Sequence, residues 1–353
     1  MSTEVLEPRL APRDAEPVAH THTARGRLGS WLLSLAVLAL LCLASIAIGS
    51  QTLPLATVFH ALLHPGHTNA DLIVTDLRIP RTVLGLLVGA ALGVAGALMQ
   101  ALTRNPLADP GVLGVDAGAS LAVTVGIAYL GLHTIHEYIW PALLGAAITT
   151  VAVYAIGTGG RGGPSPARLV LAGVGLAAVF SGVTSMIALG NQSVFEGSLN
   201  WSAGSLAGRP LSTSVAVAPF IAVGLVMAAA ISRDLNAIAL GDDLAAALGS
   251  RSVVVRVVAV AAITLLAGAA TAAAGPIAFV GLMIPRIARW ITGPDQRWIL
   301  AFSLTLGPCL LIASDVIGRI VMSPSELPVG IVTAFVGAPV LIFIARRMRT
   351  SDL

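Results

Sequence analysis

The chain has 353 residues, of which 56% are hydrophobic and only 10% are charged. A soluble domain carries about 25% charged residues, so a mean hydropathy of +0.90 excludes a soluble globular domain and indicates an integral membrane protein. The formal net charge is only +3, and because every basic residue is an arginine, the chain cannot contain a GxxxxGK[ST] phosphate-binding loop.

The first 28 residues are polar and hold four arginines and three prolines. This composition predicts a disordered cytoplasmic tail over 1–28, followed by a transmembrane domain over 29–348. The apolar run at 31–50 follows a long tail and lacks a small-residue cleavage site. We therefore expect a retained first helix at this position instead of a signal peptide.

Apolar runs of a length that crosses a bilayer recur along the whole chain. We predict ten spans, at 31–50, 82–102, 112–130, 138–157, 168–190, 211–231, 253–272, 275–291, 298–318 and 328–345. The region 253–291 is the least regular, because one of its two runs is short and the other is rich in small residues. The expected fold is all-α, with about ten transmembrane helices.

Arginine placement gives these spans an orientation. Sixteen of the twenty arginines lie in segments on one side of the predicted spans, and four lie on the other: Arg78, Arg81, Arg209 and Arg319. Cytoplasmic segments are enriched in basic residues, so the larger group marks the cytoplasmic side. An even number of spans then leaves both termini in the cytoplasm.

Few polar residues lie inside the spans. Asp116 is expected near the inner end of the third span, and Asp315 near the outer end of the ninth, where Arg319 follows at i,i+4 and allows a local ion pair. So little charge near the midplane argues against a proton-coupled carrier. Cys42 and Cys309 are too few for a disulfide framework and are expected to be core thiols.

Glycines recur every four residues in the second span, at Gly85, Gly89 and Gly93. This spacing places them on one helix face, and small residues let membrane helices approach closely. We expect this face to pack tightly against another helix.

Several polar segments are candidates for function. The stretch 101–118 breaks at Pro106 and Pro110 between two spans, and Asp109 is a candidate cap for the next helix. The cytoplasmic segment 232–251 is amphipathic, and the residues alone leave two interpretations open: a short helix on the membrane surface or a docking surface for a cytoplasmic partner.

Neither a metal centre nor an enzyme active site is expected. Histidines occur in two outer loops, but they lack cysteines or nearby carboxylates, which favours ordinary surface histidines over a metal or haem site. The chain shows no paired acid and base and no nucleophile constellation. We expect a transport subunit instead of an enzyme, with no cofactor and no nucleic-acid partner.

A series of motifs resembles the FecCD-type permeases of iron-siderophore and vitamin B12 ABC importers. The motifs run in order from about residue 30 to the C-terminus: LRIPR (77–81), GALMQALTRNPLADPGVLGVDAGA (96–119), RLVLAG (168–173), ALGDDLAAALG (239–249), GPIAFVGLMIPRIAR (275–289) and ELPVGIVTAFVGAPVLIFIARR (326–347). The resemblance implies a type II ABC importer permease fold of ten helices in the bacterial cytoplasmic membrane. SLNWSAGSLAGR (198–209) favours a ferric siderophore as the cargo, and haem or vitamin B12 stays an alternative.

The resemblance also implies partners and site residues. It implies a second permease copy or paralogue, two cytoplasmic ATPase subunits and an extracytoplasmic binding protein. Outer arginines would meet acidic groups of that binding protein, at Arg78, Arg81 and Arg319, with weaker support for Arg209; lipid headgroup anchoring is the competing role. Segment 232–251 would couple to the ATPase through Leu240, Gly241, Asp242, Asp243 and Leu244. Asn105 and Leu107 would form a cytoplasmic gate, and a plain turn is the competing interpretation.

Overall fold

The computed structural model describes residues 24–49, 53–64, 66, 68–132, 134–158, 166–239 and 252–347. Throughout these ranges every regular element is helical. In chain order the elements are α1 (Ala24–Ala47), α2 (Leu55–Leu63), α3 (Asn69–Leu72), the π-helix η1 (Ile73–Arg78), α4 (Ile79–Thr103), the 3-10 turn η2 (Pro110–Leu113), α5 (Val115–Leu130), α6 (Ile135–Thr158), α7 (Pro166–Leu189), α8 (Gln192–Ser202), α9 (Leu211–Ala239), α11 (Ser252–Ala274), α12 (Val280–Thr292), α13 (Gln296–Val321) and α14 (Val329–Arg347).

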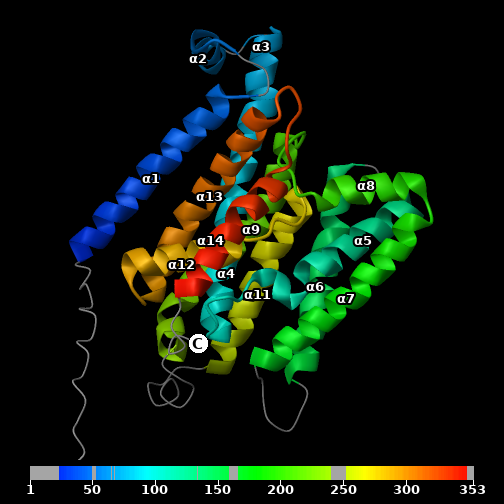
Figure 1. Cartoon of the computed structure of the whole chain (residues 1–353), viewed down its shortest axis with the longest axis vertical. Coiled ribbons are helices and arrows are strands. Elements are labelled where there is room, and N and C mark those ends of the chain that lie inside the picture. The colour runs from blue at the N-terminus through cyan, green and yellow to red at the C-terminus, as the bar shows by residue number, and fades with distance from the viewer. Residues whose placement is uncertain are drawn as a thin grey trace, which may run out of the picture.

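The helices form a bundle with α4 at its centre (Figure 1). In the apolar stretch of α4, 83% of the residues are buried, against 11% in α1 and 6% in α7, which lie at opposite edges of the view in Figure 1. Exposed apolar side chains on α1 and α7 need an apolar surrounding, which lipid supplies. Helices α2 and α3 project beyond one end of the bundle.

Seven described helical stretches are long and apolar enough to cross a bilayer, and two shorter apolar helices, Val115–Leu130 and Val329–Phe343, accompany them. The predicted all-α membrane fold is confirmed. Each of the ten predicted spans coincides with a helix, but α12 has only 13 residues. The number of complete crossings therefore stays a prediction.

The glycine face of α4 packs directly on α13. A Cβ added at Gly89 would lie 2.5 Å from the backbone of Pro308, and one at Gly85 would lie 3.1 Å from Ile312. Gly93 meets the backbone of Ser303 in the same way. The predicted close approach is confirmed, because only a hydrogen at these positions leaves room for the neighbouring helix.

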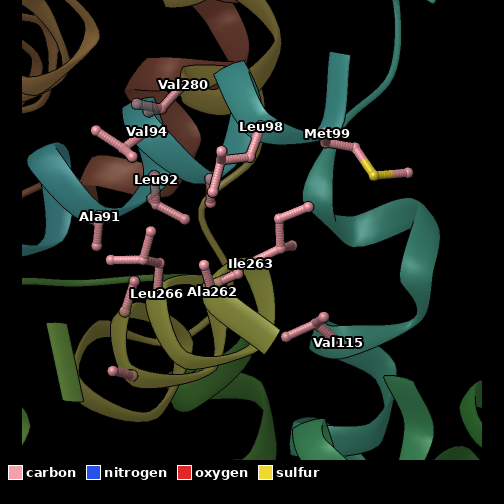
Figure 2. Close-up of a cluster of buried hydrophobic side chains, with 14 of the residues drawn as sticks. Ala91, Leu92, Val94, Leu98, Met99, Val115, Ala262, Ile263, Leu266 and Val280 are labelled. Carbon is pink, nitrogen blue, oxygen red and sulfur yellow. The ribbon is translucent and has the colours of Figure 1, made fainter. Parts of the chain in front are cut away.

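The core lies where α4, α5, α11 and α12 meet (Figure 2). Leu92 and Leu98 of α4 contribute to it together with Ile263 and Leu266 of α11, and all four side chains are buried. Small residues elsewhere on these helices bring the backbones close, so the core combines few large side chains with tight helix contacts.

Two predicted boundaries are wrong. The span predicted at 211–231 continues without a break as α9 to Ala239, because Leu235 and Ile238 keep an apolar, buried face in the last two turns. Residues 232–239 therefore extend a long helix, and they do not begin a separate surface helix. At the start of the chain, α1 already begins at Ala24, and the remainder of the predicted tail, 1–23, lies outside the described residues.

After α4 the chain turns back into the bundle. Arg104 adopts a left-handed conformation, with φ 52°, and ends the helix. The next residues return along α4: a Cβ added at Gly281 would lie 2.9 Å from Pro110, 3.2 Å from the carbonyl of Leu92 and 3.3 Å from Asp109. Leu92 is near the middle of α4, so η2 and the start of α5 lie within the bundle.

Candidate functional site

A buried group of charged side chains joins α4, α13 and the segment between α13 and α14. Arg81 donates through Nη2 to Asp315 Oδ1 at 2.6 Å and through Nε to both carboxylate oxygens at 3.0 Å. Its Nη1 pairs with Glu326 at 2.5 Å. Arg319 pairs with the second oxygen of Asp315 from one helical turn away. The predicted Asp315–Arg319 ion pair is confirmed, and it belongs to a larger network.

The same network closes the end of α1. Arg319 Nη1 donates to the carbonyl of Ser45 at 2.7 Å and to that of Ile48 at 2.9 Å. Arg78 Nη1 donates to the carbonyls of Ile46 at 2.8 Å and Ala47 at 2.7 Å. The last carbonyls of a helix have no partner within it and carry partial negative charge. Two arginines from distant segments supply the donors here.

These contacts locate the three arginines predicted to dock a binding protein. Arg78, Arg81 and Arg319 come together, and each is buried, with 4%, 8% and 1% of its surface exposed. They share a small cavity of about 180 Å³ with Glu326 and the backbone of Gly49 and Gly208. The predicted set is therefore a cluster with internal partners, and it does not form an exposed rim.

The sequence patterns did not predict two contacts of this cluster, those of Arg81 with Asp315 and with Glu326. They paired Asp315 only with Arg319, because i,i+4 spacing on one helix is visible in a sequence. The contact of Asp315 with Arg81 joins residues 234 positions apart. The sequence does hold an indication of the contact with Arg81. A carboxylate in an apolar span needs a buried partner, and Arg78, Arg81 and Arg319 were the arginines predicted on the same side of the membrane. Arg209 is not among the residues that line this cavity.

At the opposite end of the bundle, the segment after α4 is bound to the end of α9. Arg104 Nε donates to the carbonyl of Ile238 at 3.0 Å. The predicted gate residues follow directly: the side chain of Asn105, which is exposed, accepts from the backbone N–H of Leu107 at 2.9 Å. Asn105 thus shapes a tight turn. The predicted coupling residues, 240–244, lie outside the described residues.

Asp295 binds α9 to the start of α13. It caps α13 through the backbone N–H of Arg297 and accepts from the side chain of Asn236 at 3.0 Å. Asn236 also accepts from the backbone N–H of Gln296 at 2.8 Å. Partial burial alone would raise the pKa of Asp295, but the hydrogen bonds from Asn236 and Arg297, together with the charge of Arg297, outweigh it and hold that pKa below its usual value.

Two carboxylates lie where the chain returns into the bundle. Asp109 accepts from the backbone N–H of Gly111 at 2.9 Å, so it caps the short turn η2 and not α5 itself. Asp116, in the first turn of α5, accepts from the Thr271 hydroxyl of α11 at 2.7 Å. Asp116 lies in the first turn of α5, at the end of the third span where it was predicted, and this end of α5 reaches into the bundle.

Asp116 also lines a cavity of about 750 Å³. Its other walls come from the end of α8, the segment between α11 and α12, and α14, and they are mostly apolar. The tilted rings of His60 and His64 are 5.4 Å apart at the end of the bundle from which α2 projects. Among the described residues, no three histidine, cysteine or acidic side chains are grouped as a metal site.

Comparison with known proteins places these features in a family context. The sequence matches the FecCD transport family over residues 37–347. It is 49% identical over 304 residues to the ferric enterobactin transport system permease protein FepD of Escherichia coli, covering 86% of this chain and 90% of that protein. It is 40% identical over 327 residues to the iron(3+)-hydroxamate import system permease protein FhuB of Bacillus subtilis, covering 91% and 84%.

A solved structure described as an inward-facing conformation of a metal-chelate type ABC transporter has the same fold. The TM-score is 0.79, and the match covers 91% of this chain and all of that one, at 22% sequence identity. At this identity the likeness concerns the arrangement of the helices.

Proposed function

Since this chain belongs to the FecCD transport family, we propose that it is the membrane-spanning subunit of an ATP-driven importer of ferric siderophores. The observation that carries the proposal is the 49% identity to a ferric enterobactin permease over most of both chains. The hydroxamate permease extends the same inference to another class of iron chelate. ATP hydrolysis belongs to a separate chain, in keeping with the absence of a lysine-containing phosphate loop.

The proposed assembly contains a second permease, identical or paralogous, two cytoplasmic ATPase subunits and an extracytoplasmic binding protein. The positive-inside distribution of arginines supports an orientation with both termini in the cytoplasm. In this orientation α2, α3 and the cavity with the three arginines face the binding protein, and the turn at Asn105 faces the ATPases.

We propose that the arginine cavity receives an acidic side chain of the binding protein. The cavity is lined by three arginines and Glu326, and with the adjoining Asp315 carboxylate the cluster has a net charge of +1 (3 − 2). Arg81 and Arg319 bind the Asp315 carboxylate and hold the cluster together, and Arg78 donates to the backbone carbonyls of Ile46 and Ala47. Arg78→Gln should therefore weaken docking at low salt with less damage to folding than changes at the other two, as measured by binding-protein affinity. An unchanged affinity would remove Arg78 from the interface.

We propose that the segment after α9 couples ATPase motion to the gate. The hydrogen bond from Arg104 to Ile238 connects the last turn of α9 with the residue before Asn105. A movement of residues 240–244 would thus displace Asn105 and Leu107 through Ile238 and Arg104. Replacing Asp242 and Asp243 with arginine should uncouple ATP hydrolysis from transport, and coupled transport at the normal rate would exclude this role.

The decisive experiment reconstitutes the chain with its ATPase and binding protein in vesicles and measures uptake of iron-55 chelates. Uptake of a ferric siderophore should require ATP on the membrane face that carries the ATPase subunits. It should also require the binding protein on the opposite face. Haem and cobalamin, offered separately, test the alternative cargoes. Uptake that persists without ATP and follows a proton gradient would refute the proposal in favour of a secondary transporter.

A further inference from the structure

A groove of about 500 Å³ lies between α6 and α11. Its walls come from α6 between residues 147 and 155 and from α11 between residues 257 and 265, and they are apolar except for two threonines and Tyr154. Val151 and Val257 of these walls are 68% and 51% exposed, so the groove opens on the surface of the bundle. Both helices are long and apolar enough to cross a bilayer, which places this surface against lipid.

Small side chains open the groove, and its two threonines are satisfied within their own helices. Ala147 and Ala261 lie in the facing walls. The hydroxyl of Thr150 donates to the carbonyl four residues earlier in α6 at 2.9 Å, and that of Thr264 does the same in α11 at 2.8 Å. Hydrocarbon is the material that fills such a groove inside a bilayer, because an empty one forfeits dispersion contacts along both walls.

One end of the groove lies near a membrane surface. Beyond the groove, a Cβ added at Gly268 of α11 would lie 3.2 Å from Ala146 of α6, so later residues of α11 meet earlier residues of α6. The two helices are therefore antiparallel, and Tyr154, close to the end of α6, lies level with the start of α11. The acidic residue of α6, Glu137, is in its first turn, at the opposite end.

Arg256 brings a positive charge to the end of the groove at the start of α11. It is the one charged residue of this helix, and Val260, one turn later on the same side, lines the groove. A guanidinium binds phosphate oxygens through two parallel N–H groups. Tyrosine is typical of membrane–water interfaces, where its hydroxyl reaches polar headgroups. The groove therefore joins an apolar channel to a phosphate-binding group.

We propose that this groove binds one acyl chain of an anionic phospholipid, with the lipid phosphate at Arg256 and the Tyr154 hydroxyl beside the headgroup. Basic sites between membrane helices are typical binding places of anionic lipids. A zwitterionic lipid offers the same hydrocarbon, but its own cation opposes Arg256, so the site distinguishes the two headgroups. The site depends only on the membrane location of the chain. A lipid bound there holds α6 and α11 together directly after the proposed coupling segment.

The test is native mass spectrometry of the full chain in detergent with equal amounts of dioleoyl phosphatidylglycerol and dioleoyl phosphatidylcholine. The complex with one phosphatidylglycerol should exceed that with one phosphatidylcholine about fivefold, as expected from one arginine near an anionic headgroup. Arg256→Gln keeps a long polar side chain and should bring the ratio to within about twofold. Arg25→Gln is the matched control: it removes the same charge from an exposed position in α1, across the bundle from α6 (Figure 1), and should keep the preference.

Ala261→Leu tests the apolar part of the site, because the larger side chain narrows the groove. It should lower the bound fraction of both lipids. Equal binding of the two lipids by the wild type, equal effects of Arg256→Gln and Arg25→Gln, or undiminished binding of both lipids by Ala261→Leu would overturn the proposal. The comparison of the two arginines leaves the groove itself unchanged, so it decides the question even where Ala261→Leu does not fold.

A second experiment tests whether another copy of the chain covers the groove in place of lipid. Val257→Cys places a thiol on the exposed wall, and vesicles containing this variant are treated with a short bis-maleimide. The wild type, whose cysteines are Cys42 and Cys309, is the control. The variant should stay monomeric on denaturing gels like the wild type, and a cross-linked dimer specific to Val257→Cys would overturn the lipid assignment.

Discussion

Removing the carboxylate of Asp315 should destabilise the folded chain strongly. Asp315 accepts hydrogen bonds from Arg81 and Arg319, and both arginines are buried, at 8% and 1% exposure. After Asp315→Asn, Arg81 keeps Glu326, but Arg319 keeps only an uncharged hydroxyl and the carbonyls at the end of α1. Breaking a buried ion pair from one side typically costs about 3–5 kcal/mol.

The loss can be measured by thermal unfolding in detergent with a dye that fluoresces on reaction with buried thiols, because Cys309 is buried. At roughly 2 °C per kcal/mol for a chain of this size, the midpoint should fall by about 6–10 °C. Asp76→Asn is the control: its carboxylate is exposed and bonds to the Thr75 hydroxyl, so its effect should stay within about 0.5 kcal/mol.

A second variant tests the cause of the loss. If the unpaired guanidinium is responsible, the double variant Asp315→Asn/Arg319→Met should recover part of the lost stability, since it removes the orphaned charge as well. Equal midpoints for Asp315→Asn and Asp76→Asn, or a further large loss in the double variant, would refute the reasoning.

Three further changes test the packing, the capping and the gate. Gly89→Ala should lower the free energy of unfolding by about 1–3 kcal/mol, because its Cβ would meet the backbone of Pro308. Gly182→Ala on α7, where a Cβ has nothing within 4 Å, should be neutral in the same melting assay. Equal midpoints for the two variants would contradict this. Asp295→Ala should cost about 1 kcal/mol at pH 7. Because the pKa of Asp295 is lowered in the folded chain, its contribution is present above the unfolded value of about 3.9 and is lost as the pH falls through the folded value. In melts at pH 7, 5 and 3 the difference from the wild type should be smallest at pH 3, and a difference that does not depend on pH would argue for a purely steric role. Asn105→Ala combined with Leu107→Ala should raise ATP-independent leakage of chelate from vesicles, and unchanged leakage would leave this segment as a plain turn.

Patterns with a short period were predictable from the sequence. The spacing of Gly85, Gly89 and Gly93 gave the packed face of α4, and the i,i+4 spacing gave the pair of Asp315 and Arg319, because a helix places such residues together whatever surrounds it. Hydropathy located the membrane helices to within about five residues, except at the start of α1 and the end of α9.

Features that depend on tertiary structure were not predictable. The partnership of Arg81 with Asp315 requires α4 and α13 to be adjacent, and no local pattern encodes this. The depth of Asp116 depends on the chain returning along α4 after Arg104, whereas a hydropathy profile places the start of every span at a membrane surface. The end of α9 was misplaced because Arg233 and Asp234 made its last turns appear too polar to continue a span, although Leu235 and Ile238 are buried.

The uninterrupted course of α9 has a mechanical consequence. A helix of 29 residues, with Pro219 inside it, is about 44 Å long, and where it tilts as a unit a small rotation at one end becomes a large displacement at the other. A tilt of roughly 5° about its start at Leu211 would move its end at Ala239 by about 4 Å. The end at Ala239 is bound to α13 through Asn236 and Asp295 and to Arg104 at the end of α4. A force applied at this end of α9 would therefore also displace α13 and the end of α4, to which it is hydrogen-bonded.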